Sequence, residues 1–82
     1  MIELIDRLIN FQVRYNVDCT FSVFTNEDKT DMFIMILLDK NGYRVSRCID
    51  YKQWLEMTNM EKDFHLSQML RALNEYTEQD KE

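Results

Sequence analysis

The dipeptide Asn41-Gly42 constrains the fold of this chain more than any other feature of its sequence. Gly42 is the only glycine among the 82 residues, and the chain has no proline. Asn-Gly is the preferred pair for a two-residue type I′ turn, because both central residues of that turn need positive φ angles. An apolar run over residues 32–38 precedes the dipeptide, and a mixed run over residues 43–49 follows it. The sequence therefore predicts a β-hairpin.

The length of the turn fixes the register of this hairpin. Leu38 is expected opposite Val45, and Asp39 opposite Arg44 as a charge pair beside the turn. One face then collects Met32, Ile34, Ile36, Leu38, Val45 and Ile49. The other face collects Phe33, Met35, Leu37 and Cys48. The first strand of the hairpin is thus apolar on both faces, which is typical of a central strand.

Two further elements are predicted before the hairpin. Residues 17–25 alternate between apolar and polar side chains, as expected for an antiparallel strand with one wet face. Residues 2–15 form an amphipathic helix with a broad apolar stripe. The polar residues expected on the opposite face of this helix are Glu3, Arg7, Asn10 and Arg14.

The C-terminal third has helical periodicity from Tyr51 to Tyr76, and Asp50 is suited to cap its start. One unbroken helix over this range would be ~39 Å long, whereas strands of about seven residues are only ~24 Å tall. Thr58-Asn-Met-Glu61 is a capping-box sequence, which indicates a new helix start. We therefore expect a short helix over residues 51–57 and a longer one over 59–76.

Together these elements predict the α+β class, with a helix, three strands and one or two further helices. The three strands are expected to form an antiparallel meander in the order 1-2-3, with the helices packed mainly on one face. Residues 1–76 would form a single domain, and residues 77–82 a frayed polar tail.

The two cysteines, Cys19 and Cys48, fall on the outer strands of this sheet, ~9.6 Å apart. That distance is too long for a disulfide. We expect reduced, buried thiols, as in a cytoplasmic protein. The chain starts without the basic end and apolar core of a secretory signal, and no apolar run is long enough to span a bilayer.

No motif for catalysis, metal binding or phosphate binding is present. His65 is the only histidine, and it has no acid and nucleophile at the spacing of a catalytic set. His65 and the two cysteines match no zinc spacing, and the acids near residue 28 lack the alternation of an EF-hand. We expect a protein that is not an enzyme and that binds no metal or other cofactor.

The formal net charge of −5 argues against direct nucleic-acid binding, which needs clustered lysines and arginines. It is compatible with ordinary solubility charge and with a protein partner that has a basic surface. The acidic residues expected to contact such a partner are Glu27, Asp28, Asp31, Asp39, Glu56, Glu61 and Asp63.

A second candidate surface depends on where the helices pack. If they all cover one face of the sheet, Phe33, Met35 and Leu37 form an exposed apolar patch, which would mark a partner or dimer surface. If the helices cover both faces, no patch remains. The alternative function from this feature is a homodimeric structural or regulatory module.

In element order, size and acidity, the whole chain resembles the phage-encoded inhibitor proteins, anti-CRISPR proteins among them. The resemblance includes the helix, the three-stranded meander, the following helices and the lack of catalytic residues. It rests on no motif, so it assigns no functional residue. It implies a stoichiometric inhibitor of a host nucleic-acid enzyme, with acidic side chains in a site that normally holds phosphates.

Overall fold

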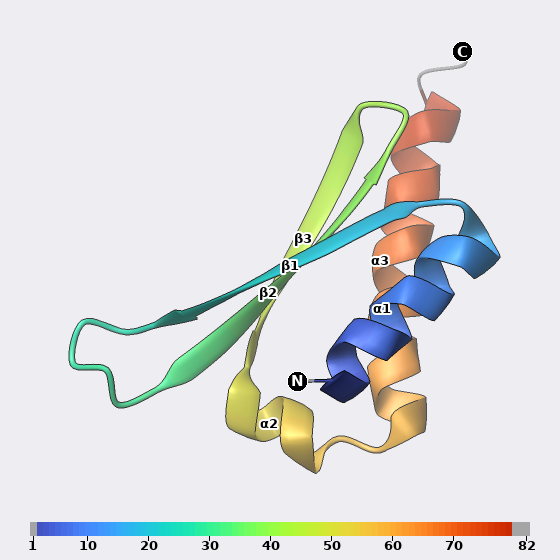
Figure 1. Ribbon diagram of the computed structural model, residues 1–82. Coiled ribbons are helices and arrows are strands. Elements are labelled where there is room, and N and C mark those ends of the chain that lie inside the picture. Colours follow the sequence, from blue (N-terminus) through green and yellow to red (C-terminus); the bar gives the residue numbers. More distant parts are fainter. Residues whose placement is uncertain (1, 80–82) are drawn as a thin grey trace.

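A computed structural model describes residues 2–79 of the chain, with side chains for residues 2–76. The elements are α1 (Ile2–Tyr15), β1 (Asp18–Thr25), β2 (Met32–Lys40), β3 (Tyr43–Asp50), α2 (Tyr51–Glu56) and α3 (Asn59–Gln79). The three strands form one antiparallel sheet in the order β1-β2-β3 (Figure 1). The predicted α+β fold with a central β2 is confirmed.

The β2–β3 hairpin has the predicted register. Leu38 lies opposite Val45, and Arg44 donates a 2.7 Å hydrogen bond to the carboxylate of Asp39. Asn41 and Gly42 have φ angles of 56° and 85°, as a type I′ turn requires. A Cβ atom at Gly42 would meet no atom within 4 Å. The backbone conformation, and not a lack of space, therefore favours glycine here.

The core lies between one face of the sheet and the helices, which gather on that side of it (Figure 1). Ile34, Ile36 and Leu38 of β2 are 0% exposed on this face, whereas Met35 on the opposite face is 37% exposed. The helices contribute Leu4, Leu8, Phe11, Trp54, Leu66, Met69 and Leu73 to the core. The expected packing of the helices mainly on one face is therefore confirmed.

Both α2 and α3 begin at the caps predicted from the sequence. The carboxylate of Asp50 accepts a 2.8 Å hydrogen bond from the backbone N–H of Lys52. The hydroxyl of Thr58 accepts from the N–H of Glu61, and the Glu61 carboxylate accepts in return from the N–H of Thr58. This reciprocal pair is a capping box. It starts α3 where the sequence predicts.

The end of α3 differs from the prediction. The helix continues to Gln79, so residues 77–79 of the expected polar tail belong to α3. The rest of that tail, residues 80–82, lies outside the described residues. Extension of an existing helix adds one hydrogen bond for each residue that is fixed, and this needs no apolar face. For that reason α3 can continue beyond Tyr76, where its apolar periodicity ends.

The predicted orientation of α1 is only partly correct. Leu4, Leu8 and Phe11 are buried, but Ile2 is 79% exposed and Ile9 55% exposed. The side chain of Arg7, expected on the outer face, is only 15% exposed. The reason is that α3 lies beside α1 and covers the flank that carries Arg7. The apolar flank on the other side of α1 is left in solvent.

Both cysteines are free thiols, as expected. Cys19 pairs with Leu38 and so lies on the helix side of the sheet, whereas Cys48 pairs with Met35 on the other side. The expectation that both are buried is wrong for Cys48, which is exposed. Burial, and then the charge of Asp18, raises the pKa of the Cys19 thiol to about 11.

Candidate interaction surface

The face of the sheet that turns away from the helices carries a column of apolar side chains. We define the apolar column as Phe24, Phe33, Met35 and Leu37. The rings of Phe24 and Phe33 stack with their centroids 5.6 Å apart. Phe24 and Met35 are exposed, and Phe33 and Leu37 are half-buried. The structure therefore brings together the three apolar residues predicted from the sequence and adds Phe24.

The residues on both sides of the apolar column are small. They are Thr20 and Ser22 on β1, and Ser46 and Cys48 on β3. Side chains in a sheet stand roughly perpendicular to it, so Phe, Met and Leu extend further than these neighbours. An approaching surface would meet the apolar column first.

Carboxylates lie at both ends of the apolar column. At the end near the β2–β3 turn, Asp18 and Asp39 are register partners on the uncovered face, and Arg44 pairs with Asp39. At the other end, the loop between β1 and β2 carries Glu27, Asp28 and Asp31 together with one lysine. This loop extends away from all three helices (Figure 1).

Side-chain hydrogen bonds order the acidic loop. The Asn26 side-chain oxygen accepts from the backbone N–H groups of Thr30 and Asp31, at 2.9 and 3.2 Å. Lys29 has a positive φ of 56°, which turns the chain back toward β2. The backbone that carries the three loop carboxylates is therefore held in a defined conformation.

The other predicted acidic residues lie on the helical side of the molecule. Glu61 belongs to the capping box, Asp63 forms an ion pair with Arg7, and Glu56 is exposed at the end of α2. The structure thus places Asp39 and the three loop acids around the apolar column. It places Glu56, Glu61 and Asp63 elsewhere.

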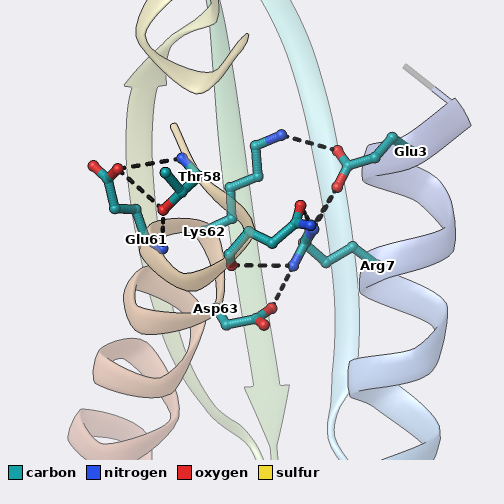
Figure 2. A network of polar contacts seen from close by, with 7 residues as sticks. Glu3, Arg7, Thr58, Glu61, Lys62 and Asp63 are labelled. Atoms are coloured by element: carbon teal, nitrogen blue, oxygen red, sulfur yellow. Dashed lines mark hydrogen bonds and ion pairs between the residues drawn. The ribbon is translucent and has the colours of Figure 1, made fainter. Parts of the chain in front are cut away.

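A polar network joins α1 to the start of α3 (Figure 2). Arg7 pairs with Glu3 at 2.7 Å and with Asp63, and it also donates to the side-chain oxygen of Asn59 at 2.8 Å. Lys62 lies 3.4 Å from the second Glu3 oxygen and 5.2 Å from the centre of the Trp54 ring. Among the described residues, no buried side-chain polar atom lacks a hydrogen-bond partner.

This network has the properties of a structural contact. Burial alone would raise the pKa of Glu3, but the hydrogen bond and charge of Arg7, and then those of Lys62, outweigh it and lower the pKa. The charged groups satisfy one another, so none is held ready for a ligand. We assign the network to stability.

Two other polar features lie on the helical side of the molecule. A groove of about 630 Å³ between α1 and α3 is lined by both acids and arginines. His65 lies 2.8 Å from a guanidinium nitrogen of Arg47, which also donates to Gln68. Within residues 2–79, no group of three or more His, Cys, Asp or Glu side chains is placed to hold a metal ion. No helix in that range is long and apolar enough to cross a membrane.

Comparison of the chain with protein-family models, with curated proteins and with solved structures found no match. The functional argument therefore depends on the chain's own residues.

The sequence contains an indication that Phe24 belongs to this surface, which the alternation of the strand alone did not reveal. Phe24 is the one large apolar residue at the positions of β1 that otherwise carry Asp18, Thr20 and Ser22. An aromatic residue in such a row indicates that the wet face of an edge strand is apolar at one end. The register then places it beside Phe33.

Proposed function

We propose that this protein is a non-enzymatic binding module that places the uncovered face of its sheet against a partner protein with a basic surface. The observation that carries the proposal is the apolar column with carboxylates at both ends. An apolar centre with a charged margin is the usual composition of a protein interface. The charge of that margin selects the partner.

The apolar column supplies the affinity in this proposal. Exposed aromatic and methionine side chains that lie together on a rigid sheet can bury area without a large loss of conformational freedom. The β2 backbone beneath them is fixed on both sides by neighbouring strands. The residues with the largest expected effect on binding are therefore Phe33 and Met35.

The acidic ends supply the specificity. Asp18 and Asp39 at one end and the three loop acids at the other face two arginine or lysine clusters on the partner. Charge complementarity of this kind raises the association rate and rejects acidic partners. A basic nucleic-acid-binding site on a host protein has the required charge. The proposal therefore includes the inhibitor role that the resemblance to phage-encoded proteins implies.

Site-specific photocrosslinking tests the proposed surface. A crosslinking amino acid is placed at Phe33 in one variant and at Met60 in a matched control, because Met60 is a highly exposed apolar residue on α3. We expect a crosslinked protein from lysate only with the Phe33 variant, and less of it at high salt. Equal capture by both variants, or capture that salt does not change, would contradict the proposal.

The captured partner then allows a direct measurement of affinity. Met35→Lys should weaken binding at least tenfold, because a charge replaces the centre of the apolar column. Met60→Lys should leave the affinity unchanged. The intrinsic fluorescence of buried Trp54 checks that both variants are folded. A nucleic-acid ligand of the partner should compete with the protein if it occupies the same basic site.

A further inference from the structure

We infer that the outer edge of β1 and the exposed flank of α1 form a dimer interface with a second copy of this chain. The two β1 strands would pair antiparallel, and the two α1 helices would pack beside each other on the helix side of the joined sheet. This surface is distinct from the apolar column. The inference does not depend on the proposed function.

The outer edge of β1 pairs with no other described strand, and Gln12 covers only its first outward N–H group. Among the described strands, β1 pairs only with β2. The backbone N–H of Cys19 bonds to the side chain of Gln12 on α1, so it points away from β2. Backbone groups alternate in direction along a strand. Phe21 and Val23 therefore direct their N–H and C=O groups outward as well.

Nothing in the sequence of β1 prevents pairing with another chain. Natural edge strands are commonly protected by charges, by proline or by bulges. Residues 19–25 contain no charged residue and no proline, and all eight residues of β1 are paired with β2 in an unbroken register. The other edge of the sheet differs, because β3 carries Arg44 and Arg47.

The flank of α1 above this edge is aliphatic and exposed. Its residues are Ile2, Ile5, Ile9 and Val13, of which Ile2 and Val13 are almost four-fifths exposed. At about 100° per residue these four side chains share one flank of the helix. Arg7 on the opposite flank faces α3. Ile5, Ile9 and Val13 therefore face away from α3, on the side where Gln12 reaches the β1 edge, whereas Ile2 also lines the groove between α1 and α3.

A second copy fits both elements at once. The middle of β1 lies about 17 Å from its start, measured from Val17 to Ser22. On α1, the point at the same distance from the connection between the two elements lies about 11 residues before Tyr15. A twofold axis near the middle of β1 would thus pass close to Ile5. An antiparallel strand pair at ~4.8 Å and a helix pair at roughly 8–10 Å can form around the same axis.

The charge distribution favours a second copy over the basic partner of the uncovered face. Two chains that each carry a net charge of −5 would bring no carboxylates together along the outer edge of β1 beyond Asp18, because residues 19–25 carry no charge. A basic partner would find no carboxylate there to pair with. In the resulting six-stranded sheet, both apolar columns would lie on the same face.

The test measures oligomeric state across the micromolar range by light scattering and sedimentation equilibrium. We expect a species of twice the 10.0 kDa chain mass. Ile9→Lys should convert it to the monomer by placing a charge in the helix contact one turn from Ile5, whereas the matched variant Met60→Lys should remain dimeric. Circular dichroism and Trp54 fluorescence confirm that both variants are folded.

Amide hydrogen exchange supplies a second readout that the strand pairing must satisfy. The N–H groups of Phe21 and Val23 should exchange slowly in the wild-type dimer and much faster in Ile9→Lys. A wild-type chain that is monomeric at all concentrations would overturn the inference. So would a dimer that Met35→Lys dissociates and Ile9→Lys does not, because that dimer would be joined through the apolar column.

Discussion

The contact between α1 and α3 depends on one guanidinium group, and its removal should measurably destabilise the fold. Arg7→Met keeps the apolar stem of the side chain but deletes every polar contact to Glu3, Asn59 and Asp63. The contacts to Asn59 and Asp63 join residues more than fifty positions apart in the chain. Because Arg7 is only 15% exposed, water cannot fully replace them.

The expected magnitude follows from the exposure of each partner. The carboxylates of Glu3 and Asp63 are 48% and 65% exposed, so each ion pair should contribute less than about 1 kcal/mol. The 2.8 Å hydrogen bond to Asn59 should add about 1 kcal/mol. We expect Arg7→Met to lower the free energy of unfolding by about 2 kcal/mol, or Tm by roughly 8–16 °C for a domain of this size.

Urea unfolding followed by Trp54 fluorescence measures this change, because Trp54 is the only tryptophan and is buried. The matched control is Arg71→Met, which removes an i,i+4 pair with Glu75 at 3.7 Å between two largely exposed side chains. That control should cost only about 0.3 kcal/mol. If Arg7→Met costs no more than Arg71→Met, the assignment of the network to stability is wrong.

Three further outcomes test other parts of the structure. A thiol reagent at pH 8 should label Cys48 well before Cys19, because a pKa of about 11 leaves only about one Cys19 thiol in a thousand ionised. Mass spectrometry of the Cys48→Ser variant measures the labelling of Cys19 alone. Labelling of Cys19 as fast as that of Cys48 would contradict the burial of Cys19. Gly42→Ala should destabilise the fold by about 1 kcal/mol through its positive φ, and an unchanged urea midpoint would exclude that strain. Because the pKa of Glu3 is lowered in the folded protein, the stabilising effect of Glu3 should be complete above the usual pKa of 4.5 and should disappear as the pH falls through the lowered pKa. Glu3→Gln should therefore reduce the loss of stability in acid. A pH profile of stability identical to that of the wild type would refute the contribution of Glu3.

The parts of the fold that the sequence predicts well are those set by local chemistry. Asn41-Gly42 allows one turn type, and that turn determines the face of every residue in the hairpin. Thr58 and Glu61 hydrogen-bond each other across three residues, so the start of α3 can be predicted from the sequence. These interactions join residues that are close in sequence, so tertiary contacts rarely override them.

The orientation of α1 depends on contacts that no local pattern contains. Its apolar residues cover more than half of the helix surface, and periodicity alone cannot select the buried part. The choice is made by Asn59 and Asp63, which bind Arg7 from α3. The same long-range contact leaves Ile2, Ile5 and Ile9 exposed, so a pattern that looks like a wide core stripe contains a second surface.

A dimer formed through β1 would strengthen binding through the apolar columns. Pairing through β1 joins two sheets into one and leaves both apolar columns facing the same direction. A partner with two basic sites, or a symmetric partner, could then bind both columns, and the second contact would form at a high effective concentration. Ile9→Lys would in that case weaken binding to a two-site partner although it lies outside the binding face, and it would leave binding to a single-site fragment unchanged. That difference separates a change in avidity from damage to the apolar column itself.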